Sequence, residues 1–373
     1  KVLNTLGSGS FGTVQKVQRI EDGKIYAMKK VKINGLDAKD RKNALNEVRI
    51  LASLNHPQIV GYKDAFYEDS TKSLCIIMEF ADGGDLQKKI DSTKKAYKNV
   101  PEATVWKYLI QMVNGIKYLH ENKIVHRDLK CANVFLTENG DVKLGDLNVS
   151  KVNHGGLMFT QTGTPYYASP EVWKDKPYDA KSDIWSLGCV LYEVCALKPP
   201  FTASNMKGLY NKVIKGSYQR IPQMYSDDLA AVIDMCLQVM PSKRPAAAEL
   251  LRKKEVVTHL RDCGYEEEKK ESSTNLLATI KLPSNFRMIN DKLPTSKYDS
   301  ELETVSDKET KKARNYSARG RIDSAKKLLA DRERSLSALK RFQQKPGSSN
   351  SSLNVNRVKP KKCHYRPPMS NRP

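Results

Sequence analysis

Hydrophobic and polar positions divide the first 260 residues into strands followed by helices. Residues 14–20 and 25–31 alternate as two strands around Asp22-Gly23, a dipeptide typical of tight hairpin turns. Apolar residues then recur at helical spacing between about residues 38 and 54, and residues 73–80 form an apolar strand. A second helical stripe consists of Val105, Leu109, Met112, Val113, Ile116 and Leu119. We expect this second stripe to be core and to carry no chemistry.

The positive charge of the chain is concentrated near its end. Lys and Arg number 64 against 42 Asp and Glu, which gives a formal net charge of +22. Residues 310–373 hold 18 basic and 3 acidic side chains, so +15 of that charge falls in the last 64 positions. From about residue 261 the chain consists of charge runs, Ser, Asn and Pro with few aromatics, which is typical of a disordered extension. One short helix can form there, at about residues 324–343, but its four leucines are too few for a coiled coil.

The cysteine pattern and the hydropathy of the chain favour a reducing, cytoplasmic compartment. Seven cysteines are scattered without a C-x-x-C pair, which argues against a disulfide framework or a zinc site and favours a reducing environment. No apolar run approaches the length of about 18 residues that a membrane helix needs, and no charged-then-apolar leader opens the chain. We therefore expect a soluble, cytoplasmic protein.

The strongest chemical signal lies in residues 124–136, IVHRDLKCANVFL. Asp128 is followed by Lys130 and Asn133, and Asp146 comes after a short apolar run. A carboxylate there can accept a hydroxyl proton, a lysine can neutralise a moving phosphoryl group, and amide and carboxylate oxygens can bind a metal ion. Each residue alone could decorate a surface turn, but the ordered set resembles the catalytic and metal loops of the protein kinases.

Residues 6–14, LGSGSFGTV, fill every position of the kinase pattern G-x-G-x-x-G-x-V. The same glycine spacing marks dinucleotide-binding turns, but those need a helix directly after the glycines, where this chain has a strand. No G-K-[ST] follows, which excludes the P-loop. We expect the glycines to lie on a β-hairpin whose backbone amides close over triphosphate oxygens, with Val14 covering the adenine. The nucleotide contacts expected from this loop are Leu6, Gly7, Ser8, Gly9, Ser10, Phe11, Gly12 and Val14.

The resemblance continues through the next strands and helix. Lys29 stands in the A-x-K register and would reach the α and β phosphates, whereas the adjacent Lys30 is expected to be solvated. Glu47 projects beside the helical stripe and is the candidate partner that orients Lys29. After the strand at residues 73–80 comes a hinge whose backbone would bond the adenine, with Met78 as the gatekeeper. The other expected nucleotide contacts are Ala27, Glu79, Ala81 and Phe135.

Asp146-Leu147-Asn148 departs from the D-F-G usual in protein kinases. Leucine for phenylalanine is a modest packing change. Asparagine for glycine narrows the backbone freedom on which loop flipping depends, although asparagine tolerates positive φ better than most residues. Because the metal-binding Asp146 is kept, we expect an active enzyme.

Several residues are expected to have structural roles. Glu171 occupies the A-P-E position and is expected to form a buried ion pair with Arg244, and Asp183 to brace the backbone of the catalytic loop. Thr164, within Gly-Thr-Pro, is expected to contact the catalytic loop through its hydroxyl.

HRDLK with GTPYY resembles the serine/threonine branch of the protein kinases. Leucine at the phenylalanine position of D-F-G, together with GTPYY-x-SPE, resembles the NIMA-related kinases, although Asn148 stands where that family more usually has the glycine of D-L-G. The matched blocks span roughly residues 1–259. The resemblance implies an α+β, bilobal kinase domain over residues 1–260, with lobes at about 1–81 and 82–260. Composition predicts that residues 261–373 form a basic, largely disordered tail. It also implies ATP with Mg²⁺, phosphorylation of Ser or Thr in protein substrates, and work at microtubule-organising structures, cilia or in mitosis.

The resemblance also suggests an activating phosphosite. Thr160 stands four residues before Thr164, the place of the activating threonine in that family, and Thr162 is the second candidate. Arg127, beside the catalytic Asp128, can bond a phosphate bidentately.

Two functions remain open at this stage. The first is an active protein kinase, which the set Lys29, Glu47, Asp128, Asn133 and Asp146 favours. The second is a weakly active scaffold whose basic tail binds tubulin, nucleic acid or anionic lipid. For the tail itself, a solvated linker is an equally good interpretation.

Overall fold

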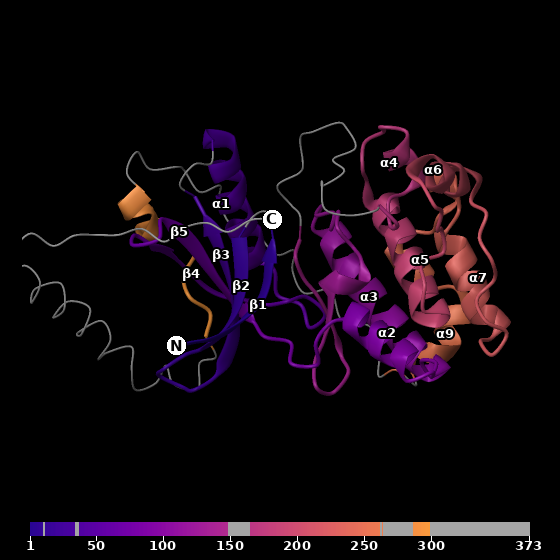
Figure 1. Cartoon of the computed structure of the whole chain (residues 1–373), viewed down its shortest axis with the longest axis horizontal. Helices are drawn as coiled ribbons and strands as arrows, with labels where there is room; N and C mark the ends of the chain where they lie inside the picture. Colours follow the sequence, from indigo (N-terminus) through magenta and orange to yellow (C-terminus); the bar gives the residue numbers. More distant parts are fainter. Residues whose placement is uncertain (10–11, 34–36, 148–164, 262, 264–285, 299–373) are drawn as a thin grey trace, which may run out of the picture. The chain divides into compact units, whose positions relative to one another are not determined.

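The chain begins with an antiparallel sheet of five strands (Figure 1). The computed structural model describes residues 1–9, 12–33, 37–147, 165–261, 263 and 286–298. The strand order is β1-β2-β3-β5-β4, so β1 and β4 are the edges. The strands are β1 (Val2–Gly9), β2 (Gly12–Gln18), β3 (Ile25–Lys32), β4 (Tyr62–Glu68) and β5 (Ser73–Glu79). The strands predicted at residues 14–20, 25–31 and 73–80 are confirmed, with ends displaced by one or two residues.

Helix α1 (Ala38–Ser53) links β3 to β4 and packs on the sheet. Its start is capped by Asp37, whose side chain accepts a hydrogen bond from the Asp40 N–H at 2.7 Å and so satisfies an amide that has no partner within the helix. Leu45, Val48 and Leu51 are buried in a core cluster shared with β4 and β5. The predicted helical stripe is therefore the buried face of α1, and this packing sets the direction of every other side chain on the helix.

The second lobe is mainly helical, as predicted. Residues 182–195 of α5 are all buried, so this helix forms the centre of the lobe. The predicted stripe on α3 is also confirmed as core, because each of its six residues is 0% exposed. The helices are α2 (Leu86–Lys95), α3 (Glu102–Glu121), α4 (Pro170–Trp173), α5 (Ala180–Ala196), α6 (Met206–Lys215), α7 (Asp227–Cys236), α8 (Ala247–Leu250) and α9 (Lys254–Leu260).

A short hairpin, β6 (Val134–Leu136) and β7 (Val142–Leu144), follows the 3₁₀ turn Cys131–Asn133. Its backbone is tied to the loop before β4, because the Val60 N–H donates to the Leu144 carbonyl at 2.9 Å. It is also tied to the stretch after β5, where the Gly83 N–H donates to the Leu136 carbonyl at 2.8 Å. The chain just before β4 and just after β5 is thus bonded to the hairpin that lies between Asn133 and Asp146.

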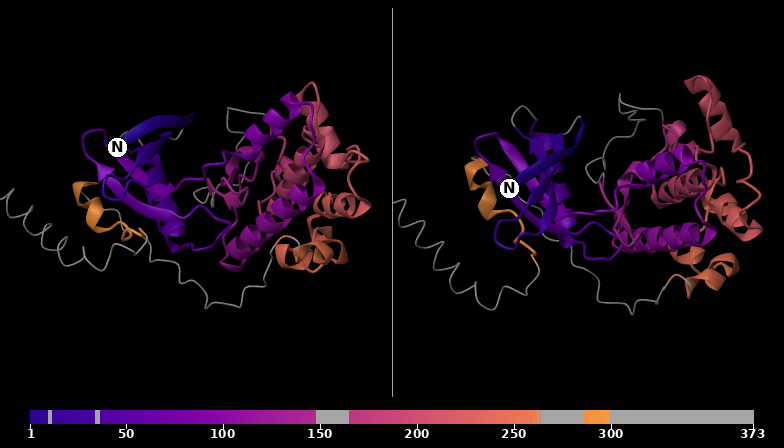
Figure 2. Two further views of the ribbon diagram at one scale, coloured as in Figure 1. Left: turned by 90° about the horizontal axis from the view of Figure 1, so that it is seen from below. Right: turned by 60° about the horizontal axis from the view of Figure 1, so that its bottom comes forward.

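Residues 286–298, which we call the return segment, lie beside β4 (Figures 1 and 2, orange). The segment starts with the 3₁₀ helix η4 (Phe286–Asp291). Ile289 is completely buried in the core cluster that contains the inner face of α1. The composition of this region predicted a largely disordered tail, so an ordered stretch here is a finding that the sequence did not anticipate. The short helix predicted at about residues 324–343 lies outside the described residues.

The α+β, bilobal fold predicted from the sequence is the fold observed. The described residues up to Tyr298 belong to one unit of the chain. Among the described helices, none is long and apolar enough to cross a membrane.

Candidate active site

Lys29 of β3 lies between two carboxylates. Its Nζ is 2.8 Å from Glu47 Oε1 of α1 and 2.9 Å from Asp146 Oδ1, which follows β7. The neighbouring Met28 is buried on the other face of the sheet, and because side chains alternate along a strand, this places Lys29 on the face that α1 covers. The structure therefore brings together Lys29, its expected partner Glu47 and the expected metal ligand Asp146.

The charges of this trio are mutually stabilised. Burial of Lys29 would by itself lower its pKa, but the carboxylates of Glu47 and Asp146 outweigh that effect and the pKa is raised. Desolvation would likewise raise the pKa of Asp146, but the Lys29 ammonium prevails and lowers it. Lysine and aspartate are therefore both charged at neutral pH, as a phosphate ligand and a metal ligand must be.

Lys30 departs from its predicted role. Its Nζ lies 2.5 Å from Glu68 Oε2 of β4, and only 22% of its side chain is exposed. Lys29 and Lys30 do point to opposite faces of the sheet, as predicted. On its own face, however, Lys30 meets Glu68, an acidic partner that the local sequence pattern did not reveal. The prediction of a solvated Lys30 is therefore corrected.

The catalytic loop holds Asp128 from two sides. Lys130 Nζ donates to Asp128 Oδ2 at 2.9 Å, and Asn133 Nδ2 donates to the same oxygen at 3.0 Å. Asn133 Nδ2 also donates to the Asp128 carbonyl at 2.8 Å, which closes the 3₁₀ turn around the aspartate. The carboxylate is consequently fixed in orientation, with its charge partly balanced by an ammonium group.

Asp183 of α5 is hydrogen-bonded to the backbone of this loop. Its carboxylate accepts the His126 N–H at 2.9 Å and the Arg127 N–H at 3.1 Å. Complete burial would raise the pKa of Asp183, but hydrogen bonds and the nearby imidazoles of His120 and His126 outweigh it and the pKa is lowered. Arg127 has a φ of +67°, a conformation that costs a non-glycine residue free energy. The two amide bonds to a buried carboxylate offset that cost.

Leu147, which replaces phenylalanine in the D-F-G pattern, is buried. It is 1% exposed and packs in the cluster that contains Leu51 of α1 and Tyr62 of β4. Asp146, just before it, has a φ of +53°. This left-handed turn sends the aspartate toward Lys29 while the leucine points into the core. Asn148 lies outside the described residues.

The glycine-rich loop is a β-hairpin, as predicted, with Gly7 paired to Val14 and Gly9 to Gly12. A Cβ on Gly12 would lie 2.0 Å from the Lys30 carbonyl oxygen, so the sheet itself requires glycine there. A Cβ on Gly7 or Gly9, in contrast, would meet nothing within 4 Å. Packing among the described residues therefore does not require glycine at these two positions, and the backbone there is open to a close neighbour. Ser10 and Phe11 lie outside the described residues.

Of the expected adenine contacts, Met78 and Glu79 lie at the end of β5 and Ala81 follows it. Met78 packs against the core cluster from its edge. Phe135 of β6 lies against Gly145, which follows β7 of the same hairpin. The Glu79 carboxylate is engaged elsewhere, by Lys143 Nζ at 2.7 Å and by the Gly61 N–H at 3.1 Å. Glu79 can therefore serve a nucleotide through its backbone only. The other expected contacts are at least partly exposed, so a nucleotide could reach them: Leu6, Val14, Ala27 and Ala81.

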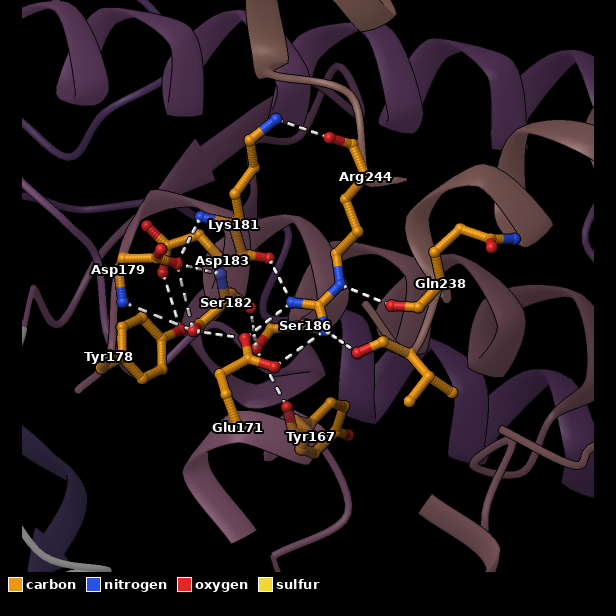
Figure 3. Close-up of polar contacts among 11 residues, drawn as sticks. Tyr167, Glu171, Tyr178, Asp179, Lys181, Ser182, Asp183, Ser186, Gln238 and Arg244 are labelled. Carbon is orange, nitrogen blue, oxygen red and sulfur yellow. Dashed lines mark hydrogen bonds and ion pairs between the residues drawn. The ribbon is translucent and has the colours of Figure 1, made fainter. Parts of the chain in front are cut away.

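Glu171 and Arg244 form the predicted buried contact (Figure 3). The guanidinium donates to both carboxylate oxygens, at 2.6 and 2.8 Å, and also to the Gln238 carbonyl at 2.7 Å. Ser182 Oγ donates to Glu171 at 2.7 Å. Burial would raise the pKa of Glu171, but Arg244 outweighs it and the pKa is lowered. This network fixes the chain after the activation segment to α5.

Sequence reasoning missed several supporting residues. The Tyr178 hydroxyl donates to Asp183 at 2.8 Å, and His120 Nε2 lies 2.8 Å from the same carboxylate. The Tyr167 hydroxyl donates at 2.6 Å to the buried carboxylate of Glu193. His120 and Tyr167 lie 63 and 26 residues from their partners, so no local spacing marks these two contacts. Tyr178 is only five residues before Asp183 but belongs to none of the motifs. Thr160, Thr162 and Thr164 lie outside the described residues.

Comparison with known proteins identifies this arrangement. The protein kinase domain family matches residues 1–255, and the chain belongs to the protein kinase family. Within that family the chain is similar to the NIMA-related kinases, as the motifs predicted. It is 42% identical to the serine/threonine-protein kinase Nek1 of Mus musculus over 253 residues, 67% of this chain and 21% of that protein. It is 40% identical to Nek2 of Homo sapiens over 258 residues, 67% of this chain and 58% of that protein.

A third relative, the serine/threonine-protein kinase Nek3 of Mus musculus, matches over a longer stretch than Nek1 and Nek2 do. There, 38% of 290 residues are identical, covering 77% of this chain and 55% of the relative. The chain thus spans between about a fifth and about three fifths of the length of these relatives.

Proposed function

We propose that this chain is an ATP-dependent protein kinase that transfers the γ-phosphoryl group of ATP to Ser or Thr residues of protein substrates. The observation that carries the proposal is Lys29 Nζ, which lies 2.8 Å from Glu47 and 2.9 Å from Asp146. A lysine oriented by a helix carboxylate and placed beside a metal-binding aspartate is the arrangement that phosphoryl transfer needs.

The nucleotide would lie between the glycine hairpin and the end of β5. Gly7 and Gly9 leave room for phosphate oxygens beside the backbone, and Lys29 supplies the cation for them. The adenine would bond the backbone of Glu79 and Ala81, because the Glu79 side chain is held by Lys143.

Asp128 is the group that we assign to the substrate hydroxyl. Its Oδ2 accepts from Lys130 and Asn133, so Oδ1 would take the hydroxyl proton. As the hydroxyl oxygen bonds to the γ-phosphorus, the bond from phosphorus to the β–γ bridging oxygen breaks and ADP leaves. Lys130 would neutralise charge on the transferring phosphoryl oxygens.

Asn133 and Asp146 would hold Mg²⁺. The amide nitrogen of Asn133 donates to Asp128, so the amide oxygen is its ligand atom. Oxygen donors of this kind suit a hard cation. When bound, Mg²⁺ neutralises the phosphate charge that accumulates during transfer.

Transfer of phosphate from radiolabelled ATP to a generic protein substrate tests this function. We expect the wild-type chain to transfer phosphate and Asp128→Ala to lose the activity. Asp91→Ala serves as the control, because Asp91 is an exposed carboxylate of α2. A wild-type protein that transfers no phosphate, or an active Asp128→Ala variant, would overturn the proposal.

A second function rests on the charge of the tail. Residues 310–373 carry +15, and such a density attracts polyanions. We propose microtubules as the partner, with localisation to the cytoplasm and to the cytoskeleton, the centrosome, the basal body or the cilium, as the resemblance to NIMA-related kinases implies. The scaffold interpretation, in which this binding is the main activity, is the weaker one because the catalytic set is complete.

A further inference from the structure

We infer that the return segment, residues 286–298, positions Glu47 for catalysis by clamping the end of α1 to the edge of the sheet. The inference rests on the kinase activity proposed above and adds residues outside the kinase family match, which ends at residue 255. Lys297 and Ile289 are the positioning residues. Neither lies among the residues that would contact ATP or a substrate.

The return segment first covers an exposed strand edge. β4 is the last strand of the sheet, so its outer N–H and C=O groups have no neighbouring strand to pair with. The Tyr67 N–H donates to Asn290 Oδ1 at 2.7 Å, and the Lys297 N–H donates to the Lys63 carbonyl at 2.6 Å. These bonds lie at the two ends of β4 and fix the segment along that edge.

The same segment holds the last turn of α1. Lys297 Nζ donates to the Ala52 carbonyl at 2.5 Å, and Ala52 lies in the final turn, whose carbonyls lack partners within the helix. The last turn of α1 contains no basic residue of its own. Since the C-terminal end of a helix carries partial negative charge, Lys297 supplies the cation that the helix does not.

The return segment also completes the core under α1. Ile289 is 0% exposed and shares a cluster with Leu51 and with Leu147, the neighbour of Asp146. The Tyr62 hydroxyl, from another residue of that cluster, donates to the Pro294 carbonyl at 3.1 Å. One segment therefore contacts both the helix that carries Glu47 and the packing that supports Asp146.

Tyr298 anchors the far end of the return segment. Its ring lies 3.8 Å from the Arg19 guanidinium and packs edge-on against Tyr26 at 5.4 Å. These contacts are with Tyr26, near the start of β3, and with Arg19 in the turn that precedes this strand. The return segment therefore extends from β4, at the edge of the sheet, to the start of β3. A segment fixed at both ends restrains the helix beneath it more than a single contact would.

Three variants of the full chain test the inference. Lys297→Ala removes the contact with Ala52, and Lys297→Arg restores a cation. Lys292→Ala is the control, because Lys292 is a second exposed lysine of the same segment whose side chain has no described contact with α1. Hydrogen exchange of the α1 amides is measured together with kcat and KM for ATP. We expect Lys297→Ala to raise exchange in the second half of α1 and to lower kcat about tenfold or more, since small misplacements of catalytic groups are costly. Arg should rescue both readouts, and the control should change neither.

Ile289→Ala provides an independent arm, because it removes core packing without removing a charge. Faster hydrogen exchange of the α1 amides and a lower kcat, both measured well below the melting temperature of the Ile289→Ala variant, would support the inference. Unchanged α1 exchange and kcat in Lys297→Ala would overturn it, as would losses that only track global unfolding. If wild-type protein shows no phosphate transfer, the kinase proposal fails, while hydrogen exchange still decides whether the segment restrains α1.

Discussion

Arg244 and Glu171 meet in a bidentate ion pair, with N···O distances of 2.6 and 2.8 Å, although only 1% and 7% of the two residues are exposed. The guanidinium is further bonded to the carbonyls of Gln238 and Lys181. A buried pair of this kind is strongly destabilised when one partner is removed, because the remaining charge is left in the interior.

We therefore predict that Glu171→Gln lowers the free energy of unfolding by about 3–5 kcal/mol. Chemical denaturation monitored by circular dichroism measures the change. Asp227→Asn is the control, because it disrupts the Arg220–Asp227 pair, in which 98% of the aspartate side chain is exposed. An exposed pair should contribute no more than about 1 kcal/mol. Equal effects of the two substitutions would contradict the prediction.

The same pair makes stability depend on pH. Burial opposes ionisation of Glu171, but Arg244 dominates and lowers its pKa below the ordinary value of 4.5. The stabilisation is therefore fully present above pH 4.5 and is lost as pH falls through the folded-state pKa. Unfolding free energies of wild type and Glu171→Gln, measured between about pH 6 and about pH 3, should converge on acidification. A constant difference would show that Glu171 is not the group responsible.

Lys29→Met and Asp146→Ala should each abolish phosphate transfer, but through different steps. We expect kcat to fall about 100-fold or more in both, the scale of losing one preorganised charge contact. Nucleotide binding should lose its Mg²⁺ dependence in Asp146→Ala and keep it in Lys29→Met. Lys30→Met is a matched control, since Lys30 is adjacent in the strand but pairs with Glu68 on the other face. Near wild-type turnover in either active-site variant would refute the role assigned to that residue.

Local patterns predicted most of the elements because the core residues recur at the spacing of the element that buries them. The α3 stripe and the inner face of α1 are buried as expected. Ordered motifs also located the residues of the candidate site, because Lys29, Asp128 and Asp146 are marked by their immediate neighbours. The Lys29–Glu47 pairing followed from the family resemblance, since 18 residues separate the partners.

Contacts between distant elements were beyond the reach of the sequence. His120 meets Asp183 across a separation of 63 residues, and Glu68 meets Lys30 across the sheet. The return segment illustrates the same limit, because its composition predicts disorder while Ile289 is buried in the core and Leu293 packs against it. Two apolar side chains in a polar stretch give too little periodicity to detect.

The basic tail should give salt-dependent binding to microtubules. Exposed charges are screened over about 8 Å at physiological ionic strength, so binding through the +15 of residues 310–373 should fall steeply as salt rises. Co-sedimentation of the full chain with microtubules across a salt series measures this, with a chain ending at residue 298 as the control. Absence of binding at low salt would return the tail to the linker interpretation.

Thr160 is the residue that we propose as the main activating phosphosite, with Thr162 as the lesser candidate. Both lie outside the described residues, and the proposal rests on the position of Thr160 four residues before Thr164, where the NIMA-related kinases carry their activating threonine. Arg127, next to Asp128, offers a planar guanidinium for a phosphate.

Phosphorylation of Thr160 adds about two negative charges, which Arg127 can bond bidentately, and so orders the loop that follows Asp146. We expect Thr160→Ala to lower kcat about tenfold or more, and Thr162→Ala to have a smaller effect. Intact-mass measurement and peptide mapping of active enzyme identify the modified residue, and treatment with a phosphatase should bring wild type to the activity of Thr160→Ala. Thr160→Ala would then be insensitive to the phosphatase, because the phosphate that matters is already absent. Full activity of Thr160→Ala beside an inactive Thr162→Ala would transfer the assignment to Thr162.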